Sequence, residues 1–196
     1  MAPRTPKKAI VFIANGTEEM EAVITIDVLR RAGIHVLVLA AVDTSTDPVV
    51  CSRGVKLVPD AYLGDDSVKI ATYDAVVVPG GAEGATTLAE NPQVCSILAD
   101  FYAQKKLVAA ICAGPLVVKA AGIQAKAAQP LRLTSHPLVK DKLDHDYLYK
   151  DERVVVDGNL VTSRGPGTSF EFALKLVSLL AGDETMNDVA APMMLA

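Results

Sequence analysis

The stretch Leu107-Val108-Ala109-Ala110-Ile111-Cys112-Ala113-Gly114-Pro115 decides the fold class of this chain. Residues 107–111 are all apolar, which is typical of a strand that is buried on both faces of a parallel sheet. Ala113 and Gly114 are small enough for a sharp turn, and Pro115 favours the first turn of a helix. A strand that ends in a cysteine and turns directly into a helix is similar to a nucleophile elbow, with sulfur in place of the serine oxygen.

Strand and helix signals alternate along the rest of the chain. The pattern predicts two hairpins, at Ser52-Arg53-Gly54 and at Asp157-Gly158-Asn159. It predicts an α/β protein with a mostly parallel sheet between layers of helices, in which the chemistry gathers at the carboxyl ends of the strands. No internal repeat or linker interrupts the pattern, so we expect a single domain over residues 1–196. The expected strands are 8–14, 34–41, 74–79, 107–111, 153–156 and 160–162, and the expected helices are 18–31, 92–106, 115–121 and 166–181.

The composition limits the classes of protein to which the chain can belong. Hydrophobic residues make up 51% and charged residues 21%, which is typical of a globular protein. The formal charge of -4 is mild and its acids and bases are interspersed, which argues against nucleic acid as a main partner. The sequence lacks a membrane-spanning apolar run and a signal peptide, so we expect no membrane span and a cytoplasmic location. Cys51, Cys95 and Cys112 lack C-x-x-C spacing, which predicts free thiols and no metal site.

Cys112 is the predicted reactive centre. Its position before a helix favours the thiolate, so the sequence predicts a lowered pKa for this thiol. The backbone N–H of Ala113 is then placed to stabilise an oxyanion. Gly80 and Gly81 follow a buried strand and let further N–H groups approach a ligand closely. The alternatives are that Cys112 only fills the core, as free cysteines often do, and that the two glycines only form a tight loop.

Glu21 is predicted to act beside Cys112. It shares a helix face with Ile24 and Val28, so its carboxyl should point inward and its pKa should be raised. A protonated Glu21 can donate a hydrogen bond to a thiolate or to its oxidised forms.

The remaining polar residues of this region have simpler interpretations. The helix dipole favours acidic residues in a first turn, which explains Glu18 and Glu19 and is also the alternative for Glu21. Asn15 or Thr17 is expected to cap the helix. His136 is the best general acid or base among the three histidines, and the alternative is a purely structural role.

Several blocks of sequence together carry a family resemblance. On these blocks the chain resembles the ThiJ/PfpI superfamily, and within it the parkinsonism-associated deglycase branch, from Ala9 to about Ala191. The blocks are Gly16-Thr17-Glu18-Glu19-Met20-Glu21, Asp27-Val28-Leu29-Arg30-Arg31-Ala32-Gly33, Cys51-Ser52-Arg53, Val78-Pro79-Gly80-Gly81, Ala109-Ala110-Ile111-Cys112-Ala113-Gly114-Pro115, Ser135-His136-Pro137-Leu138 and Thr162-Ser163-Arg164-Gly165-Pro166-Gly167-Thr168-Ser169-Phe170-Glu171-Phe172-Ala173-Leu174.

The resemblance implies a flavodoxin-like three-layer sandwich that forms a homodimer. It implies Cys112 as a redox-sensitive nucleophile, Glu21 as its partner and His136 as the second catalytic residue. It also implies a group of residues that bind the oxyanion and the substrate: Gly80, Gly81, Ala113, Arg53 and Pro166. Of these, Arg53 is implied to reach toward the active site of the partner subunit. Asp27 and Arg31 are implied to lie in the dimer region.

The function implied by the resemblance is that of a cysteine-dependent glyoxalase and protein deglycase. Such a protein converts methylglyoxal to lactate without a cofactor, removes glyoxal adducts from protein side chains and acts in the oxidative-stress response. Nuclear and mitochondrial locations are left open beside the cytoplasm. The alternative is a redox sensor with chaperone-like behaviour that is switched by oxidation of Cys112.

Departures from the family pattern narrow these expectations. Ala113 replaces the histidine that follows the cysteine in protease relatives, so we expect no peptidase activity. Val58 replaces a second, exposed cysteine, and Ala82 replaces an amide side chain beside the oxyanion site. A flavodoxin-like electron carrier is disfavoured, because the loop after the first strand is acidic and poor in phosphate-binding residues.

Overall fold

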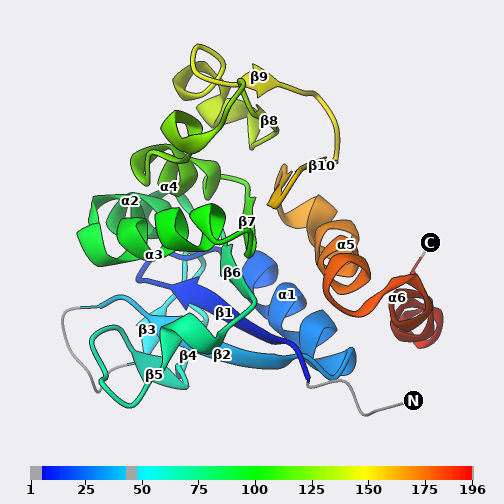
Figure 1. Cartoon of the computed structure of the whole chain (residues 1–196). Helices are drawn as coiled ribbons and strands as arrows, with labels where there is room; N and C mark the ends of the chain where they lie inside the picture. Colours follow the sequence, from blue (N-terminus) through cyan, green and yellow to red (C-terminus); the bar gives the residue numbers. More distant parts are fainter. Residues whose placement is uncertain (1–5, 43–47, 196) are drawn as a thin grey trace.

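Strand β7 (Leu107–Ile111) lies near the middle of a seven-stranded sheet in the order β10-β11-β7-β6-β1-β2-β5 (Figure 1). The computed structural model describes residues 6–42 and 48–195. Neighbouring strands of this sheet are parallel except for β10 and β11, which form an antiparallel pair. The other strands of the sheet are β1 (Lys8–Ile13), β2 (His35–Ala40), β5 (Ala61–Tyr62), β6 (Ala75–Val78), β10 (Val154–Asp157) and β11 (Leu160–Ser163).

Helices cover both faces of the sheet (Figure 1). Helices α1 and α5 pack on one face, where Val11 and Phe172 belong to one buried cluster; α2, α3 and α4 pack on the other face, where Phe12 and Leu98 belong to a second. These layers confirm the predicted flavodoxin-like three-layer sandwich. Within the described residues, none of the helices has the length and apolarity that a membrane span requires. The helices are α1 (Glu19–Arg31), α2 (Ala82–Glu90), α3 (Pro92–Ala103), α4 (Pro115–Ala120), α5 (Ser169–Ala181) and α6 (Asp183–Ala190).

Two short strand pairs lie outside the main sheet. The hairpin of β3 (Val49–Val50) and β4 (Lys56–Leu57) confirms the turn predicted at Ser52-Arg53-Gly54. Strands β8 (Arg132–Leu133) and β9 (Leu148–Tyr149) pair in parallel, and a 3-10 helix, Pro137–Lys142, lies between them in the chain.

The start of α1 differs from the prediction. The cap is Glu18, whose carboxylate accepts a 2.8 Å hydrogen bond from the N–H of Glu21. The expected caps are used elsewhere: Asn15 accepts a hydrogen bond from the N–H of Val50, and Thr17 accepts one from the N–H of Ala14. The sequence pattern also missed α2 and α6.

The order of the strands decides where the functional side chains meet. Strands β1, β6, β7 and β11 are neighbours in the sheet and run in the same direction. Their carboxyl ends therefore lie at one edge. The loops at this edge bring together the segments of Glu21, Gly80-Gly81, Cys112 and Gly165-Pro166.

Candidate active site

Cys112 has a strained backbone. Its φ of 64° lies in the left-handed region, which costs a residue other than glycine about 1 kcal/mol or more. Three backbone hydrogen bonds hold it there: Cys112 N–H donates to Ser163 (3.0 Å), Gly114 N–H to Ile111 (2.8 Å) and His136 N–H to Cys112 (2.9 Å). The sharp turn predicted for the elbow is therefore confirmed. Hydrogen bonds with neighbouring segments stabilise the strained backbone conformation of Cys112.

Gly80 and Gly81 approach the site because they have no side chain. A Cβ on Gly80 would lie 2.6 Å from the Cβ of Cys112 and 2.7 Å from Oε2 of Glu21. Gly81 has a φ of 89° and lies against the backbone of Thr17 and Glu18. The backbone N–H groups of Gly81 and Ala113 both donate to the sulfur of Cys112. The predicted donors are thus beside the thiol.

Glu21 is buried completely, as the helix-face pattern predicts. Its Oε2 accepts a 2.6 Å hydrogen bond from the N–H of Gly80. Its Oε1 is buried, and none of the described residues forms a hydrogen bond of good geometry with it. Burial raises the pKa of Glu21 to about 7, and the charge of Glu18 adds to this, although the Gly80 N–H and the Cys112 thiol act in the opposite direction. The predicted direction of the shift is confirmed.

The lowered pKa predicted for Cys112 is wrong. Burial raises the pKa of this thiol to about 12, and the negative charge of Glu21 and its hydrogen bond with the thiol raise it further. The N–H groups of Gly81 and Ala113 lower the pKa by less than these effects raise it. The thiol and the carboxyl therefore form one coupled pair, in which ionisation of Glu21 disfavours ionisation of Cys112.

Glu19 has a role that the sequence did not reveal. Its carboxylate lies just beneath the protein surface, where the β3–β4 hairpin covers it, and only 7% of the residue is exposed. It accepts 2.8 Å hydrogen bonds from the hydroxyl of Ser52 and from the N–H of Arg53. Burial acts to raise the pKa of Glu19, but these bonds, with those from its own N–H and that of Val55, outweigh burial and lower it. Its interpretation as a helix-dipole residue was therefore incomplete.

Arg53 lies on the hairpin and is exposed. Glu19 holds its backbone, and its guanidinium donates a 3.1 Å hydrogen bond to the carbonyl of Ser52. These contacts place Arg53 on the hairpin rather than against Cys112. Its predicted contact with a partner subunit stays a prediction.

His136 is joined to Cys112 through its backbone, and its ring contacts Leu138 and faces Gly165. Besides the bond from its N–H to Cys112, its Nδ1 accepts a 3.3 Å hydrogen bond from the N–H of Leu138. In the neutral ring the proton is therefore on Nε2. On its other side, the ring faces Gly165, where an added Cβ would lie 3.4 Å from Cδ2 of His136.

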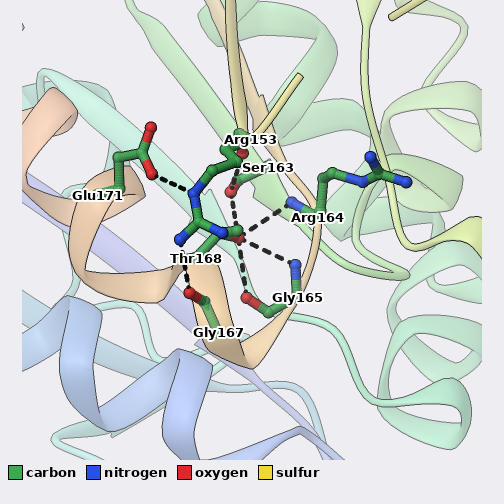
Figure 2. A network of polar contacts seen from close by, with 7 residues as sticks. All are labelled: Arg153, Ser163, Arg164, Gly165, Gly167, Thr168 and Glu171. Atoms are coloured by element: carbon green, nitrogen blue, oxygen red, sulfur yellow. Dashed lines mark hydrogen bonds and ion pairs between the residues drawn. The ribbon is translucent and has the colours of Figure 1, made fainter. Parts of the chain in front are cut away.

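Pro166 belongs to the loop that follows β11. This loop is held by the polar network in Figure 2, which the sequence did not predict. Its centre is the buried hydroxyl of Thr168, and its rim is an exposed ion pair of 2.6 Å between Arg153 and Glu171. Pro166 itself is half-buried beside Gly165.

Known proteins are similar to this chain in sequence and in architecture. Residues 7–179 match the DJ-1/PfpI family. The chain belongs to this family. The resemblance to ThiJ/PfpI proteins is thereby confirmed. Across residues 6–42 and 48–195, no group of three or more histidine, cysteine or acidic residues has the arrangement of a metal site.

Individual members of the DJ-1/PfpI family resemble the chain over almost its whole length. The Parkinson disease protein 7 homolog of Danio rerio is 49% identical, covering 96% of this chain and 97% of the relative. The glutathione-independent glyoxalase DJR-1.2 of Caenorhabditis elegans is 42% identical, covering 97% of each. The crystal structure of Drosophila melanogaster DJ-1beta has a TM-score of 0.90 and 42% identity, covering 98% of this chain and 100% of that one. Oxidized DJ-1 of Toxoplasma gondii has a TM-score of 0.86 and 37% identity, covering 97% and 99%.

Proposed function

We propose that this chain is a cysteine-dependent glyoxalase that converts methylglyoxal to lactate without a cofactor. The observation that carries the proposal is the thiol of Cys112, which lies on a strained turn between the carboxyl of Glu21 and the N–H groups of Gly81 and Ala113. A nucleophile, a proton acceptor and two oxyanion donors are what addition to an aldehyde requires. The glyoxalase name of the C. elegans relative supports the proposal.

The reaction would begin with proton transfer from Cys112 to the carboxylate of Glu21. Since the charge of Glu21 raises the pKa of the thiol, protonation of Glu21 makes the thiolate easier to form. The thiolate attacks the aldehyde carbon of methylglyoxal, an S–C bond forms and the π electron pair moves to the oxygen. The N–H groups of Gly81 and Ala113 stabilise this alkoxide, and the carboxyl of Glu21 then gives its proton to the alkoxide, which forms a hemithioacetal and restores the Glu21 carboxylate.

The second stage would move a proton between the two carbons of the substrate. Glu21 removes the hydrogen on the former aldehyde carbon, and Nε2–H of His136 donates to the neighbouring carbonyl oxygen, giving an enediol. Glu21 returns this proton to the second carbon while the hydroxyl on the first carbon gives its proton back to His136, which yields a thioester of lactate. Water then attacks the thioester, the S–C bond breaks, and lactate leaves with the thiol of Cys112 restored. The net change is the addition of one water to methylglyoxal.

The same site would act on glyoxal adducts of protein side chains. In an early adduct the former aldehyde carbon carries a hydroxyl and the amine or thiol of the protein; when its C–N or C–S bond breaks and the hydroxyl loses its proton to the departing group, the carbonyl re-forms and the Cys112 thiolate can attack it. The leaving group is then the amine or thiol of the modified protein. A peptidase function is not proposed, because Ala113 stands where a peptidase relative has its histidine.

Lactate production from methylglyoxal, without added cofactor, tests the proposal. Cys112→Ser should lower kcat by about 1000-fold or more, because the hydroxyl is a far weaker nucleophile. Cys51→Ser and Cys95→Ser are matched controls and should keep the activity. Full turnover in Cys112→Ser would show that the proposed mechanism is wrong.

A redox sensor with chaperone-like behaviour is the second proposed function. The oxidized T. gondii relative favours it, and so do the donors around the sulfur. Two equivalents of peroxide would convert the thiolate of Cys112 to a sulfinate and two waters, and the sulfinate would accept hydrogen bonds from Gly81, Ala113 and protonated Glu21. Intact mass should rise by two oxygen atoms after mild peroxide, and not in Cys112→Ala. An unchanged mass across a peroxide series would exclude the sensor.

We also propose that the chain forms a homodimer through α1. Met20 and Val23 on this helix are 52% and 43% exposed, although both are apolar. Asp27 and Arg31 form an ion pair on the same helix and could extend such an interface. Sedimentation equilibrium should give twice the chain mass. A monomer at micromolar concentration would contradict the proposal.

A further inference from the structure

Three hydrogen bonds join Glu18, Glu21 and Gly80 into a closed triangle. The carboxylate of Glu18 accepts a 2.8 Å hydrogen bond from the N–H of Glu21. The N–H of Glu18 donates a 3.0 Å bond to the carbonyl of Gly80, and the N–H of Gly80 donates a 2.6 Å bond to Oε2 of Glu21. Each of the three residues is therefore bonded to both of the others. The carboxyl of Glu21 also forms a hydrogen bond with the thiol of Cys112, so the triangle lies against the proposed nucleophile.

The triangle is a modified capping box at the start of α1. In an ordinary capping box, the side chain of the cap accepts from the N–H of the third helical residue, whose own side chain accepts from the N–H of the cap. Glu18 is the cap of α1, and Glu21 is the third residue of the helix. The first bond of the box is present. In place of the second, Gly80 accepts from the N–H of Glu18 and donates to the carboxyl of Glu21. The carboxyl of Glu21 is thereby directed to Gly80 and Cys112 instead of to the cap.

Glu18 differs from an ordinary helix cap. Serine, threonine, aspartate and asparagine are the usual caps, as Asn91 is for α3. Glu18 is half-buried, and its charge adds to the raised pKa of Glu21. An ordinary cap would stabilise only its own helix. The side chain of Glu18 instead closes a triangle whose other two bonds are both made by Gly80, so its loss should loosen the contact between Gly80 and the carboxyl of Glu21.

We propose that Glu18 is a positioning residue for Glu21. Its carboxylate holds the N–H of Glu21, and the closed triangle keeps the carboxyl of Glu21 on the N–H of Gly80 and beside the thiol of Cys112. The inference rests on the proposed function, in which Glu21 takes a proton from Cys112 and gives it to the alkoxide. Glu18 acts through Glu21 and takes no proton itself.

Two readouts test the proposal in the full-length chain: the amide proton resonance of Gly80, which reports its bond to Glu21, and kcat for methylglyoxal at pH 8. At this pH Glu21 is mostly ionised, since its pKa is about 7 and loss of the Glu18 charge lowers that pKa. Glu18→Ala should move the Gly80 resonance upfield, because the hydrogen bond lengthens, and should lower kcat by about tenfold with a smaller change in KM. Glu18→Gln keeps an acceptor for the N–H of Glu21 and should restore both.

Asn91→Ala is the matched control. Asn91 caps α3 by accepting hydrogen bonds from the N–H groups of Gln93 and Val94. Its replacement should lower the stability of the chain, as loss of a helix cap does, but should leave the Gly80 resonance and kcat unchanged. If Glu18→Ala does not fold, Glu18→Gly takes its place, because glycine is tolerated at a helix cap and also lacks the carboxylate.

The outcomes separate the positioning role from the glyoxalase function. An unchanged Gly80 resonance or an unchanged kcat in folded Glu18→Ala or Glu18→Gly would overturn the positioning role. A Glu18→Gln variant that behaves as Glu18→Ala would also overturn it, because the charge of Glu18 and not its hydrogen bond would then be responsible. Absence of methylglyoxal turnover in the unaltered protein would overturn the glyoxalase function instead, and the Gly80 resonance would still test the positioning role.

Discussion

The first turn of α1 presents two carboxyl groups to two different regions. Glu19 faces the β3–β4 hairpin, and Glu21 faces the pocket around Cys112. Both are buried, and burial acts to raise the pKa of each. The pKa of Glu19 is nevertheless lowered, whereas that of Glu21 is raised to about 7.

The difference lies in the number of donors that each region supplies. The hairpin supplies a hydroxyl and several N–H groups, which stabilise a permanent charge on Glu19. The pocket supplies Glu21 with one backbone N–H and a thiol, which leaves its proton free to move near neutral pH. A glutamate in the first turn of this helix is therefore structural where its hydrogen bonds are complete and chemically active where they are not.

The largest expected effect concerns the glycines of the two regions. Gly80→Ala would place a methyl against both Cys112 and Glu21, so kcat for methylglyoxal should fall by about 100-fold or more. In Gly54→Ala, on the hairpin, the added methyl meets open space, and the only cost is that alanine must adopt a left-handed backbone conformation. This variant should lose about 1 kcal/mol of folding stability and show little change in kcat. Steady-state kinetics on both variants checks this. Similar kcat values in Gly80→Ala and Gly54→Ala would show that close packing around Cys112 does not matter more for activity than packing in the hairpin.

The next effect concerns stability as a function of pH. The folded pKa of Glu21 is about 7 against an ordinary 4.5, so the native state loses stability as the pH rises between these values. The loss is about 3–4 kcal/mol, because the pKa of Glu21 rises from 4.5 to about 7 and each pH unit of this difference is worth about 1.4 kcal/mol. Glu21→Gln cannot ionise and should be the more stable protein at pH 8 by up to this amount. Urea unfolding from pH 4 to 8 measures it, and a constant difference between the two proteins would contradict the raised pKa.

The smallest effect has the opposite sign. In Glu19→Gln, one carboxylate oxygen is replaced by an amide NH₂ group, so one hydrogen-bond donor of the hairpin loses its acceptor. This should lower the free energy of unfolding by about 1–3 kcal/mol at pH 7. Because the folded pKa of Glu19 is lowered, the stabilisation is complete above pH 4.5 and is lost as the pH falls below it. The variant and the unaltered protein should therefore converge in acid. A deficit that persists in acid would point to packing rather than charge.

Local sequence signals predicted the central elements well. The run 107–111 matches β7 at both ends, since a continuous apolar stretch beside a small-residue turn has few alternatives. Helix α6 was missed although Asp183 and Glu184 mark its first turn, because Gly182 reads as a helix end and in fact ends α5 and begins α6. Helix α2 contains Gly84, whose missing side chain admits the backbone of Thr17. That contact is tertiary and leaves no local signal.

The sequence predicted which segments meet around Cys112 but not the pKa values of the groups there, and the catalytic roles stay predictions. The elbow pattern identified Cys112, and helix periodicity identified the inward direction of Glu21. The pKa of Cys112 could not be derived this way, because it depends on burial and on the charge of Glu21, which lies 91 positions earlier in the chain. The roles of Glu19 and Thr168 depend on partners brought close by the hairpin and by the turn after β11. Their positions in the family blocks were the only available signal.

The left-handed backbone at Cys112 has a consequence for engineering. Glycine adopts this conformation without strain, so a scheme that ranks substitutions by folding stability alone would favour Cys112→Gly. The first gain in thermal tolerance would then remove the nucleophile. When a residue other than glycine is kept in a strained backbone conformation, a design procedure should exclude that position from substitution.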